Sequence, residues 1–131
     1  MKDFVTFELA KKLKEKGFSL NKEDIEFIGC RFIFSDECTI KRISTIGAYE
    51  KGYFGKNIDC PTISQVLNWL REEKKLHIEL WTVGKKPIKW CHTITTLNHV
   101  GEKQGWSSGK RGDSYEAAAI AGIEYCLDNL I

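Results

Sequence analysis

Residues 105–109 read Gly-Trp-Ser-Ser-Gly and match the G-x-S-x-G nucleophile elbow. In that motif a strained turn between a strand and a helix exposes a serine for acyl transfer, and the histidine follows the serine along the chain. The last histidine here is His99, which precedes Ser107, and a chain of 131 residues is short for the fold that carries the elbow. We therefore interpret residues 105–109 as a glycine-rich loop and assign no catalytic residue to it.

Cys91 and His92 are the next candidates, because a thiolate beside an imidazole is a common nucleophilic pair. They are adjacent on a predicted strand, so their side chains point to opposite faces and do not pair with each other. His92 falls on the apolar face of that strand. We expect a core histidine there, with a general base and a metal ligand as the alternatives.

The chain has five cysteines, an odd number with wide spacing and no C-x2-C pair. This pattern argues against a disulfide framework and against a structural zinc site. No secretory leader precedes it, and no apolar run approaches the length of about 20 residues that spans a bilayer. We expect free thiols, a cytoplasmic location, no membrane contact, no bound metal and no cofactor. The cysteines are Cys30, Cys38, Cys60, Cys91 and Cys126.

Three of the four tryptophans are candidates for an interaction surface. Trp69 lies at the edge of a predicted helical stripe, Trp81 on the outer face of a predicted strand, and Trp106 in the glycine-rich loop. Exposed aromatic side chains often mark a contact with a partner. We therefore expect a non-enzymatic binding module that recognises a protein partner or a second copy of itself.

The stretch 61–80 is the element that must position these residues. Thr62 is an expected helix N-cap, with Gln65 completing a capping box. An apolar stripe recurs at helical spacing, and after Lys75 the apolar residues alternate as in a half-buried strand. A helix followed directly by a strand indicates an α+β domain. The helical stripe consists of Ile63, Val66, Leu67 and Leu70, and the strand face of Leu76, Ile78 and Leu80.

Other elements follow from caps and alternation. Residues 3–18 predict a helix that Thr6 caps and Gly17 ends, and residues 25–34 and 38–45 predict a strand pair. Residues 46–60 form either a third short strand or a loop.

In the second half, the strand after Lys75 ends near Val83, and a turn joins it to a strand over 88–97. We expect a three-residue loop that pairs Leu80 with Trp90 and Ile78 with His92. A third strand is expected around 104–107, within the otherwise undecided segment 98–112. Asp113 is the expected cap of the last helix, whose inward stripe is expected to be Ile120, Ile123, Leu127 and Leu130.

These elements predict small antiparallel sheets packed against three helices, with the order α-β-β-(β)-α in the C-terminal part. Lys and Arg number 20 against 18 Asp and Glu, a net charge of +2, and neither half is a basic arm. We expect a single domain, with residues 1–60 and 61–131 as possible sub-units.

Three blocks of the sequence resemble a group of short, uncharacterised proteins from phage and prophage regions of gut bacteria. The blocks are FVTFELAKKLKEKGF at 4–18, PTISQVLNWLREEKKLHIEL at 61–80 and SYEAAAIAGIEYCLDNLI at 114–131. The shared features are helix caps, core positions and glycine stops. The resemblance implies a mobile-element origin and carries no activity.

Residues 61–131 are also similar in element order to the double-stranded RNA-binding domain. That domain contacts phosphates with lysines at the start of its last helix, whereas residues 115–117 here are Tyr-Glu-Ala. The alternative function is therefore nucleic-acid binding through other cations, although so few charges predict no specific complex at physiological salt. The candidate contacts are Lys85, Lys86, Lys110 and Arg111.

Overall fold

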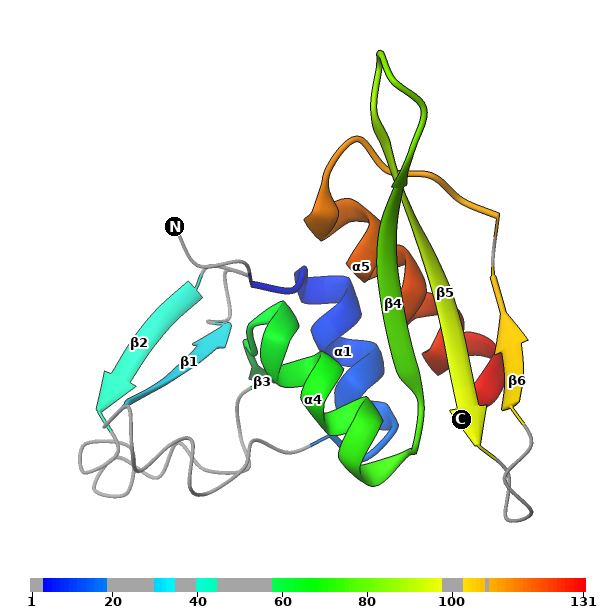
Figure 1. The fold of residues 1–131 in the computed structure, drawn as a ribbon. Coiled ribbons are helices and arrows are strands. Elements are labelled where there is room, and N and C mark those ends of the chain that lie inside the picture. The colour runs from blue at the N-terminus through cyan, green and yellow to red at the C-terminus, as the bar shows by residue number, and fades with distance from the viewer. Residues whose placement is uncertain (1–3, 19–29, 35–39, 45–57, 98–102, 108) are drawn as a thin grey trace. The chain divides into compact units, whose positions relative to one another are not determined.

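The computed structural model describes residues 4–18, 30–34, 40–44, 58–97, 103–107 and 109–131. The chain divides into two compact units, Met1–Thr62 and Ile63–Ile131, and each is described here by itself. Each unit contains helix together with a three-stranded antiparallel sheet (Figure 1). The predicted α+β class is thus confirmed. The described helices include none that is both long and apolar enough to cross a bilayer.

The first unit contains helix α1, Phe7–Glu15, with the predicted cap and the predicted stop. The hydroxyl of Thr6 accepts a hydrogen bond from the Leu9 amide at 3.2 Å. At the other end Gly17 has φ +85°, and the amide of Phe18 donates to the Leu13 carbonyl at 2.9 Å. This is a Schellman ending, which glycine favours because a Cβ is strained at positive φ.

The sheet of the first unit has the order β2-β1-β3. Its strands are β1 (Cys30–Phe34), β2 (Ile40–Ser44) and β3 (Ile58–Asp59). The strand pair predicted over 25–34 and 38–45 is confirmed for the described part of each strand. Residues 46–60 were predicted to form either a third short strand or a loop. Residues 58–59 form the short strand β3, and residues 46–57 lie outside the described residues. Rings pack between helix and sheet, Phe7 with Phe34 at 5.3 Å between centroids.

The second unit has the order α4-β4-β5-β6-α5. Its sheet, β4-β5-β6, includes the predicted third strand, and α5 contacts β4 and β5 while α4 contacts α5 and β4 (Figure 1). The helices therefore cover one face of the sheet. The elements are α4 (Ile63–Glu73), β4 (His77–Val83), β5 (Lys89–Leu97), β6 (Lys103–Trp106), α5 (Tyr115–Tyr125) and a π-helical continuation, η1 (Cys126–Leu130).

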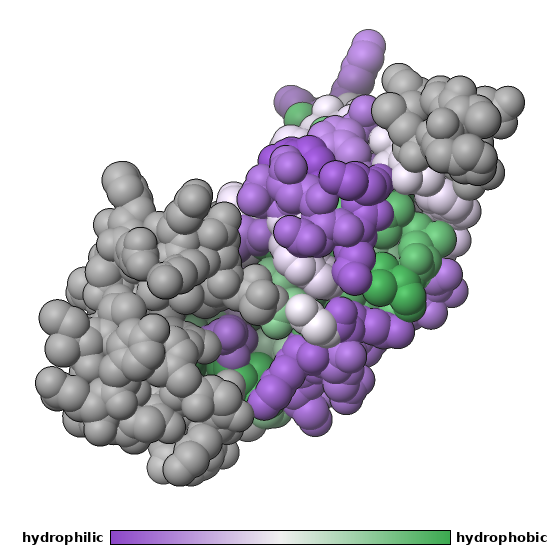
Figure 2. Space-filling model, turned by 90° about the horizontal axis from the view of Figure 1, so that it is seen from below, coloured by the Kyte–Doolittle hydropathy of each residue, from purple (hydrophilic) through white to green (hydrophobic). Residues whose placement is uncertain are grey.

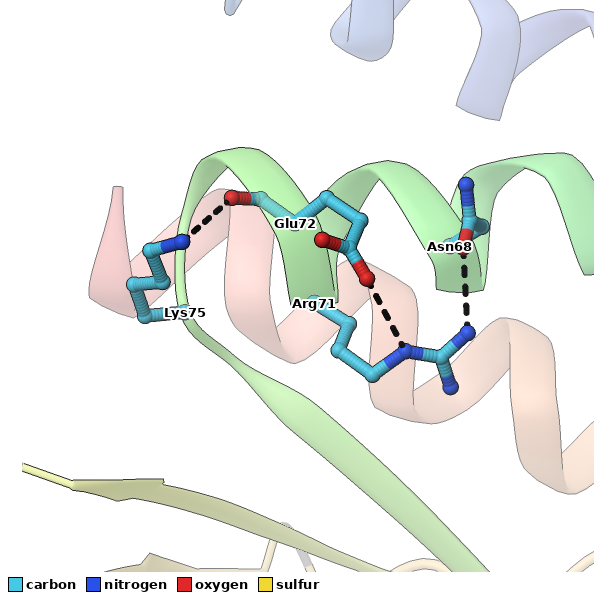
Figure 3. Close-up of polar contacts among 4 residues, drawn as sticks. All are labelled: Asn68, Arg71, Glu72 and Lys75. Carbon is cyan, nitrogen blue, oxygen red and sulfur yellow. Dashed lines mark hydrogen bonds and ion pairs between the residues drawn. The ribbon is translucent and has the colours of Figure 1, made fainter.

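Helix α4 passes directly into strand β4, as the change of period predicted. Ile63, Val66 and Leu70 are buried, and the opposite face carries exposed polar side chains. Figure 3 shows this face, where Arg71 donates to the Asn68 side chain at 3.0 Å and lies 3.7 Å from the Glu72 carboxylate.

The helix ends at Glu73, and two residues later Lys75 has φ +58° although it is not glycine. The amide of Leu76 donates to the Leu70 carbonyl at 3.0 Å, six residues back, so this bond closes a wider turn than the Schellman bond at the end of α1. The Lys75 ammonium donates to the Glu72 carbonyl at 2.9 Å (Figure 3). The sharp reversal therefore places a strained backbone residue between helix and strand.

The predicted β4–β5 register was wrong by two residues. The structure pairs Leu80 with His92 and Ile78 with Ile94, and the turn occupies residues 84–88. The predicted register would have set Pro87 opposite Val83, and proline has no N–H to donate to the ladder. A shift of two residues keeps every side chain on its predicted face, so the apolar face itself was right.

The predicted cap and inward stripe of the last helix also need correction. Ser114, not Asp113, is the N-cap, and its hydroxyl accepts from the Ala117 amide at 3.1 Å. Ile120 and Leu130, predicted to point inward, are only partly buried. Ile123 and Leu127 are buried as predicted, and small residues fill much of the rest of the inner face, where α5 lies close to the sheet. The buried positions of α5 and η1 are Ala118, Ala119, Gly122, Ile123, Cys126 and Leu127.

Replacing Lys75 by glycine should stabilise the protein by about 0.5–1 kcal/mol, because glycine adopts positive φ without the strain of a Cβ. Lys75→Ala is the matched control, since it removes the ammonium bond to Glu72 and keeps the Cβ. Urea unfolding measures both free energies. A glycine variant no more stable than the alanine variant would contradict a strained helix end.

Candidate functional site

The turn 84–88 and the segment 109–113 lie at the same end of the second unit's sheet. Val83 pairs with Lys89 where the turn begins, and Trp90 exchanges two backbone hydrogen bonds of 2.8 Å with Gly112. The chain leading into α5 therefore runs beside β5 next to the turn (Figure 1). We call this region the hairpin end and define it by its cations Lys85, Lys86, Lys89, Lys110 and Arg111.

The glycine-rich segment is the loop that brings Lys110 and Arg111 to this end. The Ser107 hydroxyl donates to the His92 carbonyl at 3.1 Å and accepts from the Gly109 amide at 3.2 Å. Gly109 has φ +75°, a conformation that glycine adopts readily. Ser107 thus ties the loop to β5 through backbone groups, which is a structural role and not that of a nucleophile.

The charges at the hairpin end are mostly cationic. The Lys89 ammonium forms an ion pair with Asp113, whereas Lys85, Lys86, Lys110 and Arg111 are exposed. The four candidate cations of the nucleic-acid hypothesis therefore come from two segments that the sheet brings to one end. Sequence spacing alone did not show this proximity, because it depends on the pairing of Gly112 with Trp90.

The structure separates the three candidate tryptophans. Residues directly opposite in an antiparallel pair lie on the same face of the sheet. Trp81 pairs with Cys91, and Trp106 pairs with Ile94, three residues further along β5, so the two indoles lie on opposite faces. Trp69 is on α4, with the Lys74 ammonium 5.5 Å from its ring centroid. The three do not form one continuous surface.

Trp81 is the one large aromatic side chain among the described residues of β4, and it lies on the face that the helices leave uncovered. Its indole N–H donates to the Thr93 hydroxyl at 3.0 Å, and its side chain is 46 % exposed. Thr93 lies diagonally across the strand pair, so the ring extends over the sheet. Cys91, directly opposite Trp81, is only 7 % exposed, which an indole lying across the strands explains.

His92 belongs to the core. Its side chain is 0 % exposed and faces α5, where a Cβ added to Gly122 would lie 3.3 Å from its Cγ atom. Burial, and secondarily the charge of Lys110, lower the pKa of His92 from its ordinary value of 6.5. The imidazole is neutral at pH 7 and lies on the face opposite to the Cys91 thiol, as strand alternation predicted.

The described thiols are those of Cys60, Cys91 and Cys126, and all three are free and buried. Burial raises the pKa of both Cys60 and Cys126 to about 12, with the Asp59 carboxylate adding to the effect at Cys60. A protonated, inaccessible thiol is a poor nucleophile. In the described part of the chain, no group of three or more His, Cys, Asp or Glu side chains is placed to hold a metal ion.

No family model matches this chain, and the searches of curated proteins and of solved structures also found no match. The geometry of the hairpin end and of Trp81 is therefore the basis on which a function is inferred.

The lowered pKa of His92 predicts that stability falls with acid. The unfolded chain binds a proton at about pH 6.5 and the folded chain only below that, so stability is complete above pH 6.5 and is lost as pH falls. One proton limits the loss to about 1.4 kcal/mol per pH unit. Unfolding free energies between pH 7.5 and 5 should show this loss in wild type and in the surface control His77→Gln, but not in His92→Gln. The same slope in all three proteins would contradict it.

The buried thiols predict slow alkylation. In the Cys30→Ser/Cys38→Ser variant, iodoacetamide at pH 7.5 should modify the folded protein at least about a hundredfold more slowly than the urea-unfolded protein, because all three remaining thiols are buried and the pKa of Cys60 and of Cys126 is raised. Mass spectrometry measures the rates. Denatured, unreduced wild type should take up five alkyl groups, as expected for five free thiols. A missing alkyl group, or rapid labelling of the folded variant, would contradict the prediction.

Proposed function

We propose that this chain is a non-enzymatic binding module whose second unit binds the phosphate backbone of a nucleic acid through the hairpin end. The observation that supports the proposal is the proximity of Lys85 and Lys86 to Lys110 and Arg111 at one end of the sheet. Cations that replace the counterions of a phosphate backbone supply most non-specific affinity. The module is expected to be weak, because its cations are few.

Two carboxylates limit this site. Asp113 is paired with Lys89, and Glu116 lies in the first turn of α5, where the double-stranded RNA-binding domain has lysines. The order α-β-β-β-α is common to both, yet element order alone does not establish a function. The proposed contacts are therefore the turn and the segment before α5, rather than the start of the helix.

A protein partner, or a second copy of the chain, is the other candidate. It is favoured by Ile88, which is 54 % exposed in the turn, and by Tyr115, which is 41 % exposed at the start of α5. On the one face that Figure 2 shows, hydrophilic side chains make up much of the described surface, with hydrophobic side chains among them. A partner surface usually has one larger contiguous patch. The mobile-element origin implied by the sequence resemblance stays a prediction.

The test is fluorescence anisotropy with fluorescein-labelled 20-nucleotide RNA, single-stranded and as a duplex, over a range of salt concentrations. We expect micromolar binding at low salt, with a slope of log affinity against log salt no steeper than about −4 for four cations. Replacing Lys85, Lys86, Lys110 and Arg111 by alanine should abolish most of the binding.

The matched control replaces four lysines of the first unit by alanine, which removes the same charge elsewhere: Lys11, Lys12, Lys14 and Lys16. Binding should be weakened far less in this control than in the hairpin-end variant. Equal losses in the two variants would show that net charge, and not this site, drives binding. No salt-dependent binding to either RNA would reject the proposal, and light scattering would then test self-association.

A further inference from the structure

The face of the β4-β5-β6 sheet opposite the helices carries a flat aromatic surface at Trp81. Strand alternation puts His77, Glu79 and Trp81 on this face, and all three are exposed. The β5 residues that the indole reaches on this face, Cys91 opposite it and Thr93 diagonal to it, are both smaller than tryptophan.

The orientation of the indole suits stacking. Its N–H is occupied by Thr93, which holds the ring across the strand pair, and about half of its surface faces solvent. Part of the ring surface is therefore open to a ligand. Every nucleobase has a π-face that can stack on such a ring, with little dependence on sequence.

The cations of the hairpin end lie at the end of the sheet toward which β4 runs after Trp81. Trp81 is two residues before Val83, where the turn carrying Lys85 and Lys86 begins. On the other side of Cys91, the segment bridged to β5 at Gly112 carries Arg111 and Lys110. The Lys89 ammonium forms an ion pair with Asp113, so the start of β5 next to the turn and the segment before α5 are in side-chain contact. An exposed aromatic ring on a strand that leads to a cationic end complements a chain that alternates phosphates with bases.

We propose that Trp81 is the stacking platform for an unpaired base of a single-stranded nucleic acid, with the neighbouring phosphates at the hairpin end. This inference rests on the proposed function and adds that the nucleic acid bound is single-stranded. Bases in a duplex are stacked on each other and do not offer a free face. The site therefore prefers single strands, and its affinity depends on whether a base is present but little on which base it is.

The experiment compares two fluorescein-labelled probes of equal charge, a 12-nucleotide oligothymidylate and a 12-unit abasic phosphodiester, by anisotropy at low salt. Wild type should bind the oligothymidylate about tenfold more tightly than the abasic chain, the size expected for one stacked base. Trp81→Ala should bind the two probes equally, with an unchanged salt slope, because no phosphate contact is lost. Trp81→Phe should keep most of the preference, and Trp69→Ala should keep all of it.

The outcomes separate this inference from the proposed function. If wild type binds both probes with the same affinity, or if Trp81→Ala keeps the preference, stacking at Trp81 is wrong while backbone binding stands. If neither probe binds, both proposals fail. Thermal unfolding shows whether Trp81→Ala is folded, and Trp81→Thr, which keeps a β-branched residue on the strand, provides a second ring-free variant if it is not.

Discussion

The close approach of α5 to the sheet at Gly122 is the constraint on which the second unit depends. A Cβ at this position would lie 3.1 Å from the Ile78 Cγ2 atom and 3.3 Å from the His92 ring, so a side chain here would push these neighbours by a few tenths of an ångström. Interiors are packed densely enough that one extra carbon is felt. Small residues on the inner face of α5 keep this short distance along the helix, and His92 is buried as a consequence.

The position of α5 also determines where the chain before it must run. The helix starts at Tyr115, and the residues leading to it pair with β5 at Gly112, opposite Trp90. The edge of β5 is thereby covered beyond the end of β6, which leaves fewer unpaired backbone groups for another strand. The same path carries Lys110 and Arg111 beside the β4–β5 turn. A packing requirement in the core thus produces the cationic end on the surface.

Much of the fold was predictable because its signals are local. Thr6 and Gly17 bound α1 through hydrogen bonds within a few residues, and the apolar alternation after Lys75 identified the buried face of β4. The errors in element boundaries were small. The N-cap of the last helix was wrong by one residue, and the register of the β4–β5 hairpin was wrong by two residues. Ser114 and Asp113 are both good caps, and the choice between them depends on the ion pair of Asp113 with Lys89, which is a contact across the fold.

By itself, the sequence determined the α+β class, the element types and the face on which each strand residue lies, because helix caps and periodicity act over a few residues. Only the tertiary structure decided which side chains meet. It separated Trp81 from Trp106, placed Gly122 against His92 and brought Lys85 and Lys86 near Lys110 and Arg111. Such contacts depend on strand register and helix distance, which residues far apart in the chain set together through packing, so no local pattern contains them.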